Sequence, residues 1–291
     1  MKKVNYLFLI AIFIIATALK SDKPAYKLFD DKGKEVKYKK LVKDALEADI
    51  IMFGELHNNP ISHWLQLQLT EDIFAEKGAG LVLAAEMFEA DNQLLLDEYL
   101  TGVVKQKSFE DEAKLWPNYK TDYKPLVEFA KENQLKFVAS NIPRRYASVV
   151  HKKGFEGLDS LDNAAKAYIA PLPPEYDPTL PGYAVMMEMM SGMGKGHANA
   201  NLPKAQAIKD ATMAYFTFAN WEPGKLVIHY NGAYHSDNFE GTVWYLKRLN
   251  PELKILTITT VQQDDIEKLS EDNTGVANYT ICVPSDMTTT Y

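Results

Sequence analysis

The sequence predicts an α/β fold in which a parallel, or mostly parallel, central sheet is flanked by helices. Two observations carry this prediction: short, near-continuous apolar runs, and intervening segments whose apolar residues lie three and four apart. Strands that are apolar on both sides are typical of a parallel sheet covered by helices on both faces. Their alternation with helical segments is the α/β pattern.

The individual elements follow from the local sequence. The predicted strands are residues 48–53, 80–85, 135–139, 225–229 and 254–259. The clearest helical segments are residues 61–77, 91–100 and 124–133. Asn59 followed by Pro60 predicts a helix start, because asparagine caps helices and proline suits the first helical position.

A proline- and methionine-rich excursion interrupts this rhythm. Five of the 14 prolines lie between Pro171 and Pro181, and a methionine-rich run follows at residues 185–190. The prolines exclude a long helix there, and methionines offer a flexible apolar surface. Two interpretations stay open: a loop and helix packed on the core, or a lid or binding surface for a flat apolar ligand.

Length and composition limit the possible classes of protein. The chain has 291 residues, 46% of them hydrophobic and 24% charged, which suits a single globular domain over residues 21–291. The lone cysteine, Cys282, excludes a disulfide scaffold, a cysteine-rich zinc module and an iron–sulfur cluster. The net charge of −7 argues against nucleic acid and anionic membranes as partners.

The N-terminal segment reads as a secretory signal peptide over residues 1–20. Two lysines precede a largely apolar stretch at residues 4–19, and Ala16, Thr17 and Ala18 offer small residues for cleavage. We therefore expect export to the periplasm or cell envelope, with an uncleaved membrane anchor as the alternative. Loss of the three lysines of this segment would take the net charge from −7 to −10. No cysteine lies near Ala18, so we do not expect a lipoprotein.

Polar residues follow four of the predicted strands, where ligands of open parallel sheets bind. These residues are Glu55, His57, Glu86, Asn141, Arg144, His229 and His235. Carboxylates and imidazoles together can exchange protons in hydrolysis or bind a divalent metal ion, and the spacing leaves both open. The predicted catalytic set, if the protein is a hydrolase, is Glu55, His57, Glu86, His229 and His235. We expect these five side chains to surround one cleft.

Several common active-site motifs are missing from the sequence. It contains no His-Glu-x-x-His helix, no Gly-x-Ser-x-Gly elbow, no phosphate-binding loop and no dinucleotide glycine fingerprint. Zinc proteases of that type, serine hydrolases with that elbow and the common nucleotide enzymes are therefore not expected.

Motifs spread from about Asp49 to His235 resemble the ChaN-type haem-binding proteins, which are iron-regulated bacterial envelope proteins. The opening motif lies at residues 54–60 (Gly-Glu-Leu-His-Asn-Asn-Pro), with a second at 85–88 (Ala-Glu-Met-Phe). The remaining matches are Trp116, Tyr123, Pro125, Leu126, residues 140–144, residues 205–214 and residues 229–235. Their order and spacing together are specific, although no single match is.

The resemblance implies an α/β fold and a dimer that encloses two haems face to face, with a tyrosine ligand on each iron. It also implies a role in iron acquisition with envelope haem-transport components. Candidate axial ligands are Tyr176 and Tyr183, which lie at the proline-rich excursion beside the methionine-rich run, and Arg144 and Arg145 are candidates to pair with propionates. Many relatives are lipoproteins, and in this respect the chain departs from the family.

The wider superfamily also resembles erythromycin esterases and the Tiki and TraB proteins, in which the opening motif serves hydrolysis with or without a metal. A metal-assisted or metal-free hydrolase is therefore the alternative to a haem-binding uptake protein. In that case Glu55 or His57 would activate water, and His229 or His235 would stabilise or protonate the leaving group.

Overall fold

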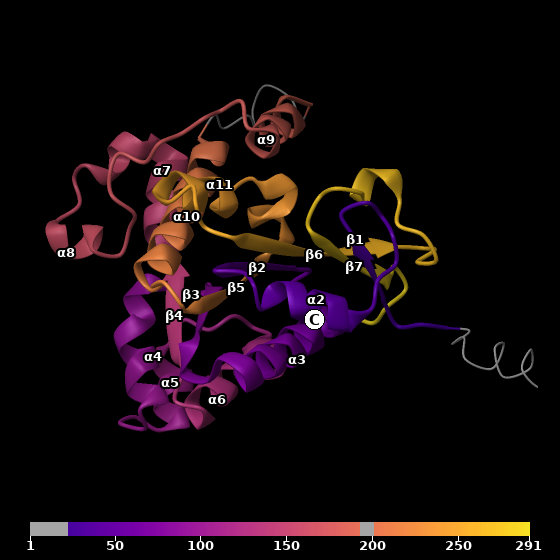
Figure 1. Cartoon of the computed structure of the whole chain (residues 1–291). Coiled ribbons are helices and arrows are strands. Elements are labelled where there is room, and N and C mark those ends of the chain that lie inside the picture. The colour runs from indigo at the N-terminus through magenta and orange to yellow at the C-terminus, as the bar shows by residue number, and fades with distance from the viewer. Residues whose placement is uncertain (1–22, 193–200) are drawn as a thin grey trace, which may run out of the picture.

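One seven-stranded sheet organises the computed structural model, which describes residues 23–192 and 201–291 (Figure 1). In chain order the strands are β1 (Lys27–Asp30), β2 (Ile50–Glu55), β3 (Leu81–Glu89), β4 (Lys136–Asn141), β5 (Leu226–Gly232), β6 (Ile255–Gln263) and β7 (Tyr279–Pro284). Their order across the sheet is β1-β7-β6-β2-β5-β3-β4, and only the β1–β7 pair is antiparallel. This confirms the predicted α/β class. The predicted signal peptide lies outside the described residues.

Ten α-helices of the described residues surround this sheet. They are α2 (Tyr38–Ala45), α3 (Pro60–Lys77), α4 (Gln93–Leu100), α5 (Gln106–Glu112), α6 (Lys124–Glu132), α7 (Arg144–Lys153), α8 (Asn163–Lys166), α9 (Pro181–Gly192), α10 (Leu202–Ala219) and α11 (Thr242–Leu249). Asn59 caps α3 as predicted, because its side chain accepts hydrogen bonds from the backbone N–H groups of Ile61 and Ser62.

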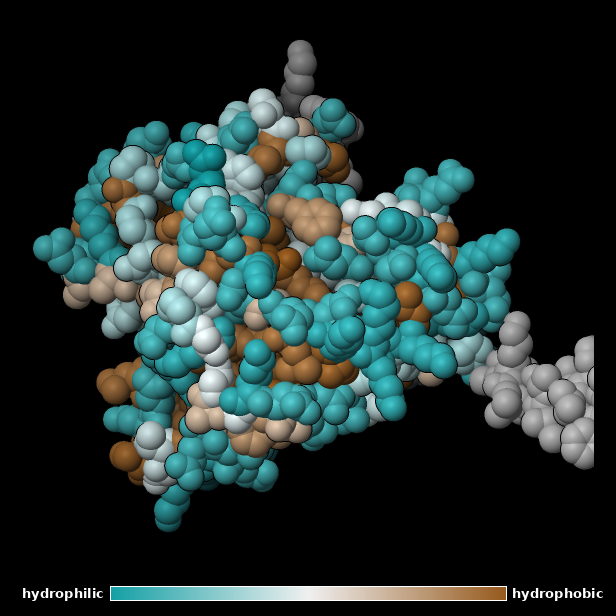
Figure 2. All heavy atoms as spheres, in the orientation of Figure 1, coloured by the Kyte–Doolittle hydropathy of each residue, from teal (hydrophilic) through white to brown (hydrophobic). Residues whose placement is uncertain are grey.

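The strand side chains alternate between two apolar cores, one on each face of the sheet. Ile51 and Phe53 of β2 pack with α3, α4 and α6, whereas Ile50 and Met52 pack with α10 and α11. Figure 1 shows these two groups of helices on opposite sides of the sheet. Burial on both faces explains why the central strands are near-continuously apolar. Figure 2 shows that the outer face in this view is mostly hydrophilic, with hydrophobic patches toward its centre.

Each predicted strand is present, but each extends further at its carboxyl end. The largest consequence concerns β5, which continues to Gly232, three residues beyond the predicted end at His229. The edge strand β1 was not predicted, because only Leu28 and Phe29 of its four residues are buried. The other unpredicted strand, β7, is followed by no helix and so lacks the strand–helix alternation.

The excursion predicted from its prolines is extended up to residue 180, and α9 follows it. Tyr183 of α9 is buried, whereas Val185 and Met187 are 42% and 39% exposed. The end of the methionine-rich run has side chains outside the description. Within residues 23–192 and 201–291, no helix is both long and apolar enough to span a bilayer.

Candidate functional site

A cavity of about 320 Å³ opens at the carboxyl edge of the sheet, where the polar strand ends meet. Its lining residues are His57, Glu86, Glu89, Trp116, Asn141, Ile142, Arg144, Lys209 and His235. Three members of the predicted catalytic set, His57, Glu86 and His235, therefore share one cavity.

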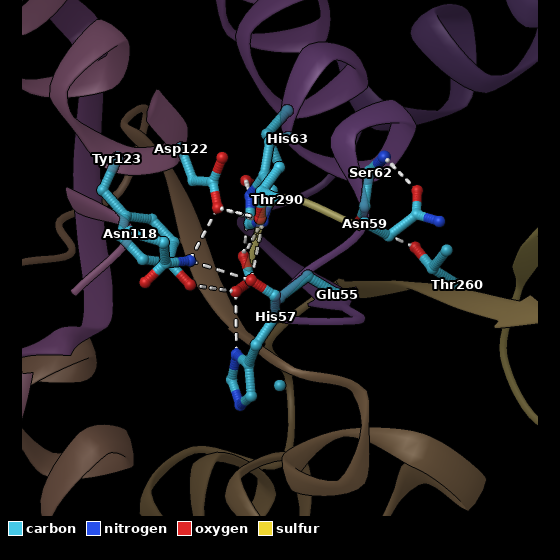
Figure 3. Close-up of polar contacts among 12 residues, drawn as sticks. Glu55, His57, Asn59, Ser62, His63, Asn118, Asp122, Tyr123, Thr260 and Thr290 are labelled. Atoms are coloured by element: carbon cyan, nitrogen blue, oxygen red, sulfur yellow. Dashed lines mark hydrogen bonds and ion pairs between the residues drawn. The ribbon is translucent and has the colours of Figure 1, made fainter. Parts of the chain in front are cut away.

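The first imidazole of the cavity, His57, is held by the buried carboxylate of Glu55. The two Glu55 oxygens accept hydrogen bonds from His57 Nδ1 at 2.8 Å, Tyr123 OH at 2.7 Å and Gln66 Nε2 at 2.5 Å. Figure 3 shows the imidazole pointing away from the rest of this network. Trp116 lies edge-on to the ring, with centroids 4.8 Å apart. Glu55 is 1% exposed, so it reaches a ligand only through His57.

Local charge raises the pKa of His57 above its usual range. Burial alone would lower this pKa, but the hydrogen bond to Glu55 and the negative charges of Glu86 and Glu55 outweigh that effect. An imidazole that is hydrogen-bonded to a carboxylate and faces a cavity is suited to general acid–base chemistry.

The second imidazole, His235, lies between two buried carboxylates. Its Nδ1 is 2.6 Å from Asp210 Oδ1, and its Nε2 is 3.2 Å from Glu86 Oε1. Burial opposes ionisation, but the charges of Glu86 and Asp210 raise the pKa of His235 to about 10. The pKa of Glu86 is lowered in turn: burial opposes its ionisation, but His235 and His57 favour the carboxylate. His235 is thus an imidazolium at neutral pH, suited to stabilise negative charge rather than to accept a proton.

The two imidazole–carboxylate pairs come from opposite faces of the sheet. By strand alternation, Glu55 lies on the face covered by α3, and Glu86 lies on the face covered by α10. Gly232 at the end of β5 lies between the two pairs. Its N–H donates to Glu86 Oε2 at 2.8 Å. A Cβ added at Gly232 would lie 2.7 Å from His57 Nε2, so only glycine lets the ring pack against this strand end.

A second layer of polar residues clamps the loop that carries His57 (Figure 3). The backbone oxygen of His57 lies 3.0 Å from His63 Nε2 and accepts from Asn118 Nδ2 at 2.9 Å. Asp122 links Asn118, at 2.6 Å, to the hydroxyl of Thr290, at 2.8 Å. The Thr290 N–H donates to the backbone oxygen of Asn58 at 2.9 Å. Helix α3 and the C-terminal segment thereby hold this loop in place.

Comparison with known proteins assigns this chain to a family. The family model described as haem-binding uptake, Tiki superfamily, ChaN matches residues 41–246. That match covers more than half of the chain. The chain belongs to the ChaN family.

Solved structures agree with the ChaN fold at low sequence identity. Campylobacter jejuni ChaN, which binds haem cofacially, has a TM-score of 0.64 and 15% identity, with 88% of this chain and 96% of that chain covered. A Bacillus cereus protein has a TM-score of 0.51 and 12% identity, with 84% and 90% covered.

One curated relative is a plant protein. The chloroplastic protein RETICULATA-RELATED 5 of Arabidopsis thaliana is 25% identical over 139 residues, which is 46% of this chain. The match covers 19% of that protein, so the ChaN-family chain spans about a fifth of its relative's length.

The expectation that His229 surrounds the same cleft is wrong for this ChaN-family chain. Its side chain is fully buried and lies 2.9 Å from Ser140 Oγ and 3.2 Å from Asn231 Oδ1, outside the cavity lining. Burial lowers its pKa to about 4, which keeps the ring neutral. The reason is the length of β5: His229 lies within the strand, and the strand end that meets the cavity is Gly232.

The haem-binding candidates implied by the ChaN resemblance do not all meet. Arg144 lines the 320 Å³ cavity, and both Arg144 and Arg145 line a neighbouring cleft, where Arg145 also pairs with Asp91 at 2.5 Å. Tyr183 is 3% exposed and donates to Asp210 Oδ2 at 2.8 Å. Tyr176 stands beside Tyr183, with ring centroids 5.8 Å apart, and neither tyrosine lines this cavity.

Sequence reasoning missed several supporting residues. They are His63, Gln66, Asn118, Asp122, Lys209 and Asp210. A signal for part of this set exists in α3, where Ser62, His63, Gln66 and Thr70 are all buried at helical spacing. A polar stripe on the covered face of a helix indicates a buried network. Within the described residues, no group of three or more His, Cys, Asp or Glu side chains has a geometry that holds a metal ion.

We expect Gly232→Ala to displace His57 while the protein stays folded. The added methyl group would meet the far end of the His57 side chain, so the ring would turn away and lose its hydrogen bond to Glu55. The pKa of His57 should fall toward its ordinary value, as measured by NMR titration of the imidazole. Gly80→Ala is the matched control, because its nearest neighbour would lie 3.9 Å away. Equal His57 titration in both variants would contradict this packing.

Proposed function

We propose that this chain is a haem-binding protein of bacterial iron and haem uptake. Besides family membership, the observation that carries the proposal is a cleft of about 770 Å³ beside the polar cavity. Leu115, Trp116 and Pro117 give it an apolar wall, and Lys114, Arg144 and Arg145 supply cations. A haem site needs an apolar slot, cations for the propionates and an axial ligand. The cleft offers the first two.

The axial ligand in this proposal is a tyrosine. Of the two candidates, Tyr183 has its hydroxyl engaged by Asp210, and burial first, then the charge of Asp210, raises its pKa strongly. The Tyr176 hydroxyl has no protein hydrogen bond within the described residues, which makes it the better candidate. Tyr291 is 63% exposed and lines the cleft itself. In a homodimer with haems between two copies, the tyrosine and the cations need not come from the same subunit.

The proposal also includes location and partners. The predicted signal peptide over residues 1–20 supports export to the periplasm or cell envelope, where the chain would exchange haem with envelope transport components.

Hemin titration of the purified protein tests the haem proposal. A saturable Soret band with defined stoichiometry should form, and at least one Tyr→Phe change among Tyr176, Tyr183 and Tyr291 should shift it and weaken binding. Phenylalanine keeps the ring and removes only the phenolic oxygen. His57→Ala should leave the spectrum nearly intact. A complete tyrosine scan without spectral change, or loss of the spectrum in His57→Ala, would rule out tyrosine ligation.

A second candidate function, hydrolysis, is favoured by the two imidazole–carboxylate pairs around one cavity. The geometry narrows the predicted roles. His57, oriented by Glu55, faces the cavity and can accept a proton from water, whereas the His235 imidazolium can stabilise the developing negative charge. Both Glu55 oxygens are engaged by protein donors, and His229 is outside the cavity.

A further inference from the structure

Two of the cations that line the 320 Å³ cavity have no partner in the part of the chain that the structure describes. Arg144 and Lys209 form no hydrogen bond or ion pair with any of the described residues, although both line the cavity. The acidic lining residues are already paired: Glu86 with His235, and Glu89 with Lys114 at 3.0 Å.

Two further features give the cavity the character of a ligand site. Helix α7, ten residues long, begins at Arg144, so the positive end of its dipole lies at the same wall. In the lining of the same cavity, Asn141 Oδ1 is buried and accepts no hydrogen bond from the described residues. A buried acceptor of this kind is satisfied by a donor that a ligand or water brings.

We propose that Arg144, Lys209 and the start of α7 form an anion subsite that binds the carboxylate or phosphate group of a small organic acid. A hydroxyl or N–H group of the same molecule donates to Asn141 Oδ1. This arrangement places the rest of the molecule against His57 and His235. If the protein is a hydrolase, its substrate is therefore a small anionic ester or amide. Turnover rests on that candidate function, whereas binding of the anion does not.

The same chemistry has a second source in this protein. Arg144 also lines the 770 Å³ cleft, so a haem propionate could present its carboxylate to the subsite. The size of the cavity favours a separate small molecule, because about 320 Å³ lies at the lower end of small-molecule sites.

Calorimetric titration of the full-length protein with inorganic phosphate and with glycerate tests the subsite. Wild type should bind at least one of them saturably. Arg144→Gln and Lys209→Gln should each weaken binding roughly tenfold, since each removes one hydrogen bond to a charged group. Lys152→Gln and Lys204→Gln are matched controls: each removes one positive charge from the same helix as a tested residue, and both residues lie outside the cavity lining. Both controls should bind as wild type does.

Two results would overturn the subsite: no saturable binding by wild type, or equal weakening in the control variants, which would indicate general charge attraction. Competition with hemin identifies the source of the anion. If phosphate displaces hemin but not hemin dimethyl ester, the subsite binds a haem propionate. If phosphate displaces neither compound, the subsite binds a free small anion. The titration requires neither turnover nor haem. It therefore tests the subsite even if the protein proves not to be a hydrolase or not to bind haem.

Discussion

Replacing His57 by alanine is expected to lower ester or amide hydrolysis by about 10²- to 10⁴-fold, the usual contribution of a positioned general base. Glu55 orients the imidazole of His57 at the cavity, whereas the His235 pKa of about 10 keeps that ring charged and unable to accept a proton. Initial rates on a panel of small anionic esters, at saturating and limiting concentrations, measure the loss.

The matched control is His151→Ala, since His151 lies in the last turn of α7, at the opposite end from the cavity. This variant should keep the wild-type rate. Glu55→Gln should lose part of the rate by changing the partner of His57 Nδ1 while leaving the imidazole present. Wild-type turnover in His57→Ala would eliminate His57 as the base, and no turnover by wild type on any ester would leave haem binding as the function.

Asp210→Ala is expected to lower the free energy of unfolding by about 3–5 kcal/mol, the cost of removing one partner from a buried ion pair. Asp210 is 1% exposed, and its oxygens contact His235 Nδ1, Thr242 Oγ1 at 3.2 Å and Tyr183 OH. Its loss would leave three buried donors without their acceptor. Denaturant unfolding followed by circular dichroism measures the change. Tyr183→Phe, which removes only one neutral donor, should cost about 1 kcal/mol.

The dependence of stability on pH provides a second readout of the same pair. The folded-state pKa of His235, about 10, lies above its ordinary 6.5. Its stabilising contribution is therefore complete below about pH 6.5 and is lost as pH rises through 10, with a slope of up to about 1.4 kcal/mol per pH unit. Asp210→Ala should flatten this slope. An unchanged slope would show that His235 does not carry the charge assigned to it.

The fold was predictable because the central strands carry their own signal. Residues such as Ile50, Ile51, Met52 and Phe53 are buried on both faces of the sheet, and this produces the continuous apolar run that identified β2. The strand ends were less predictable. Gly54 is small and Glu55 is polar, yet both continue β2. Glycine is needed at position 54 because a Cβ there would lie 2.9 Å from both Ala233 Cα and the Ile258 oxygen. Such close approach depends on tertiary packing, which a local pattern does not contain.

The candidate site was predictable only where one strand end supplied one polar side chain. His57, Glu86 and His235 follow strands and meet in the cavity as expected. Asp210 and Lys209 come from the middle of α10 and follow no predicted strand, so the strand-end pattern did not select them. His229 lies inside β5 and not at its end, because the strand continues for three more residues. The sequence pattern did not show where this strand ends.

β2 and β3 direct Glu55 and Glu86 to opposite faces of the sheet. Each imidazole–carboxylate pair is therefore supported by its own layer of helices. The packing that holds His57 belongs to the layer of α3 and α6, and the packing that holds His235 belongs to the layer of α10 and α11. The two halves meet at Gly232, whose N–H donates to Glu86 Oε2 and which packs against the ring of His57. A descendant of this chain could therefore keep one imidazole as an anchor for a new ligand while the other drifts, without rebuilding the core that supports both.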